Sequence, residues 1–119
     1  MRYFQNSEFK CPCCGEEHMD TNFLGLLDSA RHIAGVPFKI NSGYRCEKHN
    51  KEVGGVPESE HTTGEGADIA VTDSYHRFLI LSSLLEVGFD RIGIGKDFIH
   101  VGYSIHLPSE VIWTYYGGE

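Results

Sequence analysis

Apolar residues recur at the spacing of an amphipathic helix in two stretches of the chain. The first stretch covers residues 23–34, follows Asp20 and Thr21, which are good starting residues for a helix, and should end near Gly35. The second covers residues 74–86, is capped by Ser74 and is closed by Gly88. The pattern therefore predicts two long helices, each with one apolar face that needs a partner to pack against.

Shorter apolar or alternating runs indicate strands. Five such runs are present, at residues 38–40, 67–71, 91–94, 98–103 and 111–116. Helices and strands in mixed order, with several short strands together near the C-terminus, favour an α+β fold with a mainly antiparallel sheet packed with helices. No linker divides the chain, so we expect a single domain over residues 1–119, with residues 1–19 as an N-terminal arm that contains cysteines.

The composition and charge narrow the choice of partners. Acidic residues outnumber basic ones 17 to 10, which gives a formal net charge of −7. This balance argues against nucleic acid, because phosphate binding requires clustered Lys and Arg. The longest apolar stretch, residues 78–85, is far shorter than the roughly 20 residues that cross a bilayer. We therefore expect a monomer that does not bind nucleic acid or span a membrane.

Two histidines and one aspartate have the chemistry of a catalytic zinc site. His61 and Asp68 lie seven positions apart with Gly64 and Gly66 between them, and His100 lies on a later predicted strand. Two imidazoles and one carboxylate can fill three positions of a tetrahedral zinc ion and leave the fourth position for water. Taken alone, His61 would be an ordinary loop residue and His100 a core residue, so the signal depends on the whole set.

Two further polar residues could complete a hydrolytic site. Asp97 lies three positions before His100 in a predicted hairpin, where it could accept a proton from a metal-bound water. Arg45 follows a predicted tight turn and could bind a carboxylate or a developing oxyanion. The alternatives are that Asp97 is only a turn residue and that Arg45 forms a surface ion pair.

These residues belong to three motifs that occur in a fixed order. The motifs are Ser42-Gly43-Tyr44-Arg45, then Ser59-Glu60-His61 with Gly64 and Asp68, then Asp97-Phe98-Ile99-His100-Val101. Together they resemble the zinc DD-peptidase family, which includes D-alanyl-D-alanine carboxypeptidases, vancomycin-resistance dipeptidases and phage L-alanyl-D-glutamate endolysins. The resemblance covers residues 20 to about 115.

The resemblance implies a hedgehog/DD-peptidase-like fold and one catalytic Zn²⁺. It implies that His61, Asp68 and His100 bind the zinc and that Asp97 is the catalytic base. Arg45 would contact the substrate, with Ser42, Tyr44 and Ser59 in supporting positions. The implied substrate is the stem peptide of bacterial peptidoglycan, cut at bonds that involve D-amino acids. The aromatic residues Trp113, Tyr115 and Tyr116 could belong to the core or to the substrate groove.

One position departs from the family pattern. Many relatives carry an Asp two residues after the last zinc histidine, where this chain has Gly102. Loss of such a partner can weaken metal binding about 10–100-fold. Gly102 therefore keeps a second hypothesis open, in which the protein is a non-catalytic zinc-holding module that binds cell wall or forms part of a phage tail.

The first ten residues lack the basic and apolar segments of a signal peptide, which predicts synthesis in the cytoplasm. Under the peptidase hypothesis, a protein of this kind fits a phage or prophage enzyme that reaches the cell wall by other means. A cytosolic D,D-dipeptidase is the alternative.

The four cysteines suggest a second metal site. Cys11 and Cys14 form a C-x-x-C motif, and Cys46 and His49 form a C-x-x-H motif further along the chain. These four residues could bind a structural zinc that ties the N-terminal arm to the segment after Arg45. Two alternatives stay open: reduced thiols with Cys13 or Cys14 packed near Cys46, or a disulfide formed in an oxidising environment.

Overall fold

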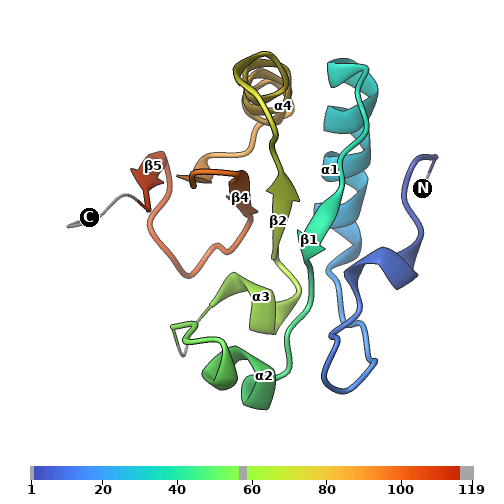
Figure 1. The fold of residues 1–119 in the computed structure, drawn as a ribbon, viewed down its shortest axis with the longest axis vertical. Coiled ribbons are helices and arrows are strands. Elements are labelled where there is room, and N and C mark those ends of the chain that lie inside the picture. The colour runs from blue at the N-terminus through green and yellow to red at the C-terminus, as the bar shows by residue number, and fades with distance from the viewer. Residues whose placement is uncertain (1, 57–58, 116–119) are drawn as a thin grey trace.

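The computed structural model describes residues 2–56 and 59–115 and has an α+β fold, as the sequence predicts (Figure 1). The elements in chain order are η1 (Asn6–Phe9), α1 (Thr21–Ala34), β1 (Ile40–Ser42), α2 (Glu47–Glu52), α3 (Glu60–Thr63), β2 (Gly66–Ala70), α4 (Ser74–Glu86), β3 (Arg91–Ile94), β4 (Phe98–Gly102) and β5 (Val111–Thr114). No helix in the described ranges is long and apolar enough to cross a membrane.

The strands form one sheet in the order β1-β2-β4-β3-β5. Its first four strands pair antiparallel, as expected, whereas β5 pairs in parallel with β3. The pairing of β2 with β4 is regular from Gly66 opposite Gly102 to Ala70 opposite Phe98. Successive residues of these two strands therefore point to opposite faces of the sheet.

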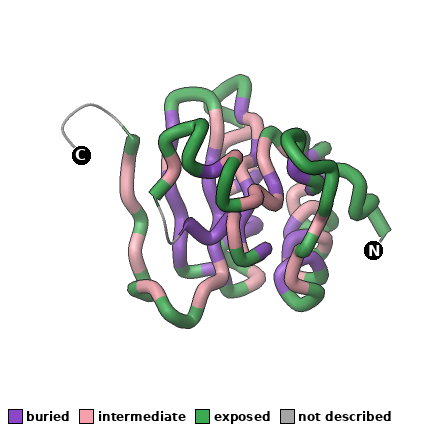
Figure 2. The backbone as a smooth tube through the Cα atoms, turned by 90° about the horizontal axis from the view of Figure 1, so that it is seen from below, coloured by how far each residue is buried: buried purple, intermediate pink, exposed green. Residues whose placement is uncertain are grey.

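One face of the sheet belongs to the hydrophobic core. The helices α1 and α4 pack against each other, and their apolar residues share a core with the strands. The fully buried members from these elements are Phe23, Leu27, Ala30, Ala67, Ile69, Ile80, Leu84, Ile92, Ile99 and Val101. Figure 2 shows these buried segments of helix and strand running through the middle of the molecule. The opposite face of β2 and β4 does not enter this core and can carry polar side chains.

Local capping explains why the long helices begin and end where the sequence predicts. The Asp20 side chain accepts a hydrogen bond of 2.9 Å from the backbone N–H of Phe23, which satisfies a free donor in the first turn of α1. Gly35 ends α1 in the left-handed conformation, with φ of 70°. At the start of α4, the Asp73 side chain accepts a hydrogen bond of 2.8 Å from the N–H of His76, so the capping residue is Asp73 and not Ser74 as the sequence predicts.

The N-terminal arm is part of the folded domain. Phe4, Phe9 and Cys11 are buried, and the carbonyl of Phe9 accepts a hydrogen bond of 2.8 Å from the N–H of Tyr44. At Gly43 the two segments pass so closely that an added Cβ would lie 2.6 Å from the Cα of Phe9. Only glycine fits this close approach.

Several predicted boundaries differ from the observed ones. The first strand covers 40–42 rather than 38–40, because Phe38 is buried in the core just before the strand begins. His61, expected on a loop, lies on the one-turn helix α3. The last strand ends at Thr114, and Tyr116, which was expected in it or in a groove, lies outside the described residues.

Candidate active site

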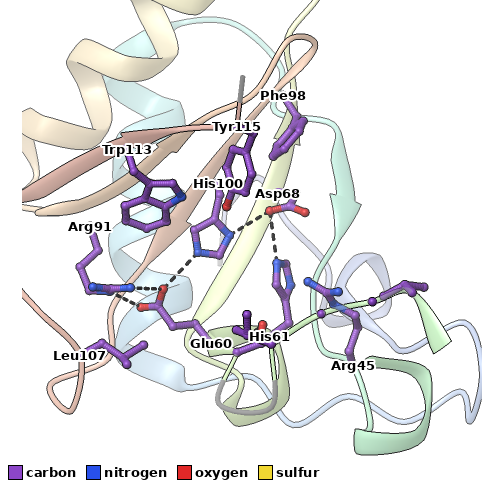
Figure 3. Close-up of a pocket in the computed structure, with 15 residues that line it drawn as sticks. Arg45, Glu60, His61, Asp68, Arg91, Phe98, His100, Leu107, Trp113 and Tyr115 are labelled. Carbon is purple, nitrogen blue, oxygen red and sulfur yellow. Dashed lines mark hydrogen bonds and ion pairs between the residues drawn. The ribbon is translucent and has the colours of Figure 1, made fainter. Parts of the chain in front are cut away.

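The pairing of β2 with β4 brings Asp68 directly opposite His100 on the face that does not enter the core. The ring nitrogen Nδ1 of His100 lies 2.9 Å from Oδ1 of Asp68. His61 approaches the same oxygen from α3, with its Nε2 at 3.2 Å (Figure 3). The structure thus brings together the three residues for which the sequence predicts zinc binding.

The short helix α3 places His61. At the start of the helix, the hydroxyl of Ser59 accepts a hydrogen bond of 3.2 Å from the N–H of His61. Gly64 ends the helix with φ of 75°. An added Cβ at Gly64 would lie 1.9 Å from the carbonyl oxygen of His18, so this turn requires glycine for space as well as for conformation. His61 is 2% exposed, and its ring therefore has little freedom to move.

Each histidine uses its other ring nitrogen outside the cluster. Nδ1 of His61 lies 2.7 Å from the backbone carbonyl of Gly43, and Nε2 of His100 lies 3.1 Å from Oε1 of Glu60. Both partners only accept hydrogen bonds, so these two nitrogens carry the protons of the neutral rings. The remaining nitrogen of each ring then presents a lone pair to the Asp68 carboxylate.

Two lone pairs and a carboxylate facing one another need a cation between them. One donor atom from each of the three residues lies within 4.8 Å of the other two, which is a spacing that one metal ion can bridge. Two imidazoles and one carboxylate form a common catalytic zinc set, and histidine ligands usually donate their second N–H to a carbonyl or a carboxylate. The donor set therefore fits zinc in its atoms and in the groups that orient them.

Electrostatics favour a charged Asp68. Burial disfavours the carboxylate, but the facing rings of His100 and His61 outweigh this effect and hold the pKa of Asp68 well below its ordinary range. Burial also lowers the pKa of His100, while Asp68 and Glu60 raise it, with a net rise. A positive charge on or beside the His100 ring is thus stabilised by the carboxylates of Asp68 and Glu60.

Glu60 is a site residue that the sequence analysis missed. It is 4% exposed, and its carboxylate accepts from Nε2 of His100, from Nε of Arg91 at 2.9 Å and from the N–H of Ser104 at 3.0 Å. Burial opposes ionisation, but these donors lower the pKa of Glu60 to about 2. The partners lie 31 to 44 positions away, so no local pattern could have revealed the role.

Glu60 also explains the departure at Gly102. A Cβ added at Gly102 would lie 2.0 Å from Oε1 of Glu60, so the glutamate carboxylate fills the space beside this glycine. A carboxylate that contacts His100 is therefore supplied by Glu60 of α3, although position 102 has no side chain. Arg91, which packs its guanidinium over Trp113 and donates to the carbonyl of Pro108, holds that carboxylate in place.

A cavity of about 810 Å³ opens beside the cluster (Figure 3). Its lining includes all three predicted ligands together with Arg45, Ser59 and Glu60. Phe98, Trp113 and Tyr115 form an aromatic wall. The sequence left Trp113 and Tyr115 open between core and groove, and the parallel pairing of β5 with β3 brings them to the cavity.

Arg45 lies in the cavity wall as the sequence predicts. Its backbone N–H donates a hydrogen bond of 2.9 Å to the carbonyl of His61, which links the arginine to α3. Its Nε is buried and has no hydrogen-bond partner among the described residues. Burial lowers the pKa of Arg45 although the nearby Asp68 raises it, and a lowered guanidinium pKa still leaves the group charged.

The other predicted site residues are not all in this cavity. Asp97 is exposed on the turn between β3 and β4 and lines a separate hollow with Lys39 and Asn41. Because side chains alternate along β4, Phe98 and His100 share the cavity face, whereas Asp97 lies on the turn before this strand begins. The role of Asp97 as catalytic base therefore stays a prediction.

Ser59 lines the cavity, whereas Ser42 lines an adjacent hollow that also reaches Asp68. Tyr44 lines neither, because its ring packs edge-on against His18 at 5.0 Å between centroids. Of the predicted cysteine site, Cys11, Cys14 and Cys46 lie together, but His49 groups with Cys13 and Glu52.

Comparison with known proteins agrees with this geometry. A family model described as Peptidase M15 matches residues 2–102, which includes the cluster, Arg45 and the N-terminal arm. A search of curated proteins finds none that matches the chain. The M15 family is zinc-dependent, and the set of two buried histidines and a partly exposed aspartate is the kind of metal site that such a peptidase needs. The chain therefore belongs to the peptidase M15 family of metallopeptidases.

Proposed function

We propose that this protein hydrolyses peptide bonds in the stem peptides of bacterial peptidoglycan, at bonds that involve D-amino acids, with one zinc ion held by His61, Asp68 and His100. The observation that carries the proposal is the pair of imidazole nitrogens, one from His61 and one from His100, that face Asp68 in the wall of a cavity. When bound, zinc supplies a Lewis acid that polarises a scissile carbonyl and lowers the pKa of water.

The protein contributes a rigid frame for this chemistry. Asp68 and His100 lie on paired strands, and His61 lies on a capped helical turn, so all three come from regular elements. Sites on such elements hold their geometry more precisely than sites on loops. The acceptors Gly43 and Glu60 fix which nitrogen of each histidine faces the ion.

Arg45 is the residue that we propose for anchoring the substrate. Stem peptides carry free carboxylates, and a planar guanidinium can bind a carboxylate with two parallel hydrogen bonds. The buried Nε, which has no partner within the described ranges, is a donor available for this purpose. Its place beside Asp68 in the cavity lining keeps the bound carboxylate close to the metal ligands.

The aromatic wall provides the remaining contacts. Phe98 and Trp113 offer apolar surface for short side chains and for the methyl groups of alanine residues. Burial and the charges of Asp68 and Glu60 raise the pKa of Tyr115, so its hydroxyl stays protonated and can donate to a substrate oxygen. In Figure 3 this hydroxyl points toward Asp68 and His100.

The non-catalytic alternative is less well supported. It depended on Gly102, which removes a carboxylate beside the last zinc histidine. Glu60 supplies a carboxylate to the same histidine at 3.1 Å, so the orienting group is present. Action on the cell wall after release by a phage or prophage stays a prediction, because nothing in the structure tests it.

The proposal is tested on purified cell-wall sacculi. The zinc-loaded protein should release new free amino groups, a chelator should stop the release and added zinc should restore it. The variant H61A should release none, while R45A should raise KM more than it lowers kcat. Zinc-loaded protein that sediments with sacculi from several bacteria but releases no amino groups would overturn the peptidase and favour the wall-binding module.

A further inference from the structure

Three thiols meet outside the cavity that holds the histidine cluster. The sulfur atoms of Cys11, Cys14 and Cys46 lie within 4.8 Å of one another, and those of Cys11 and Cys46 are 3.7 Å apart. None of the three lines the cavity around Asp68. The peptidase chemistry does not use them, so their convergence needs a separate explanation.

The first two thiols come from a tight turn. The N–H of Gly15 donates 2.8 Å to the carbonyl of Cys11, and Gly15 adopts φ of 75°, which L side chains rarely adopt. This turn brings the side chain of Cys14 back beside Cys11. Backbone N–H groups of Cys46, Cys14 and Cys13 are directed at the Cys11 sulfur. Backbone donors aimed at a sulfur stabilise a thiolate.

The third thiol comes from the other half of the predicted site. Cys46 precedes α2, and its sulfur accepts 3.4 Å from the backbone N–H of His49 in the first turn of the helix. The imidazole of His49 belongs to an adjacent group with Cys13 and Glu52. The C-x-x-C motif of the N-terminal arm therefore lies beside the C-x-x-H motif at the start of α2.

Ordinary packing does not account for these thiols. Free cysteines that act as small apolar residues are usually buried, and only Cys11 is buried here, whereas Cys14 is exposed and Cys46 is intermediate. Structural zinc sites accept three thiolates and one imidazole in a tetrahedral set. We propose that Cys11, Cys14 and Cys46 bind a second, structural zinc ion and that His49 turns its imidazole from the Cys13 group to provide the fourth ligand.

This site would support the peptidase centre from a distance. Gly43, whose carbonyl orients His61, and Arg45 both lie in the segment just before Cys46. The same segment is bound to the arm through the hydrogen bond from Tyr44 to Phe9. An ion that joins the arm to Cys46 therefore fixes the position of that segment, which is the structural role we assign to it.

Metal content separates this site from the peptidase site. The protein purified without chelator should contain two zinc ions per chain. C14S, C46S and H61A should each contain one, and C14S combined with H61A should contain none. C13S is the matched control: its thiol is exposed and lies outside the proposed set, so C13S should retain two ions. H49A should lose the second ion, and loss in C13S with retention in H49A would overturn the assignment of His49.

Cobalt substitution gives a readout that does not depend on activity. Thiolate ligands produce strong near-ultraviolet charge-transfer absorption with Co²⁺, and imidazole and carboxylate ligands do not. The cobalt-loaded wild type and H61A should both show this absorption, and C46S should lack it. Two outcomes would overturn the proposal: wild type with one zinc that H61A removes, or a mass two hydrogens low that shows a disulfide among these cysteines. In either case, the zinc content of H61A still measures binding at the peptidase site.

Discussion

The two histidines of the cluster are each oriented by an acceptor that lies outside it. The Gly43 carbonyl holds His61 at 2.7 Å, and the Glu60 carboxylate holds His100 at 3.1 Å. Each contact decides which ring nitrogen is free to bind metal. At the scale of the residue, the site is therefore defined by five residues rather than by the three that bind the ion.

The substitution E60Q tests the orienting role of Glu60. Glutamine keeps the size of the side chain but loses the charge that Arg91 and His100 contact, so zinc affinity should fall about 10–100-fold. Titration with a competing chelator measures this change. E86Q, at an exposed position on α4, should bind zinc like the wild type. Unchanged affinity in E60Q would show that Glu60 does not position His100.

The substitution G102A tests whether Glu60 occupies the space beside Gly102. A Cβ there would lie 2.0 Å from the glutamate oxygen, so the carboxylate has to move away from His100. We expect a loss of about 1–3 kcal/mol in the free energy of unfolding, together with weaker zinc binding. Chemical denaturation measures the first effect.

G25A is the control for this substitution, because nothing lies within 4 Å of an added Cβ at Gly25 on α1. It should be neutral or slightly stabilising. Equal stability of G102A and G25A would mean that the space beside Gly102 is open.

The substitution D97N tests the placement of Asp97. Its side chain is exposed and lines a different hollow from the metal ligands, so kcat/KM on sacculi or a stem peptide should change less than about threefold. Zinc content should stay the same. A loss of several orders of magnitude in kcat with zinc retained would restore Asp97 as the catalytic base and show that the turn rearranges around substrate.

At the scale of the element, capping and periodicity explain which predictions were accurate. The bounds of α1 and α4 agree with the sequence because Asp20, Gly35 and a continuous apolar face each specify the same helix. The role of Asp97 as catalytic base stays a prediction, because Asp97 lies just before β4 begins whereas His100 lies in the middle of that strand. The parallel pairing of β5 depends on long-range packing, which local patterns do not specify.

The substitution G43A tests the contact between the arm and the segment after β1. A Cβ at Gly43 would lie 2.6 Å from the Cα of Phe9, so alanine must separate the two segments. This shift moves the carbonyl that orients His61, and both the melting temperature and the zinc affinity should fall. Scanning calorimetry with and without zinc measures the two effects. Wild-type values for both would contradict the coupling of the arm to the metal site.

At the scale of the whole molecule, one face of the sheet packs in the hydrophobic core and the other face carries the metal-binding residues. Its core face packs on α1 and α4, and the other face of β2 and β4 carries Asp68 and His100 (Figures 1 and 3). The sequence predicts the ligands and Arg45, because their motifs are local and ordered. It does not predict Glu60 or the aromatic wall, because these reach the cavity only through tertiary packing.

The most direct test is an anomalous difference map collected at the zinc edge from crystals grown with zinc. The map should contain a peak within bonding distance of Nε2 of His61, Nδ1 of His100 and a carboxylate oxygen of Asp68, with no protein atom in the fourth position. A zinc-loaded crystal with no peak among these three side chains would contradict the account.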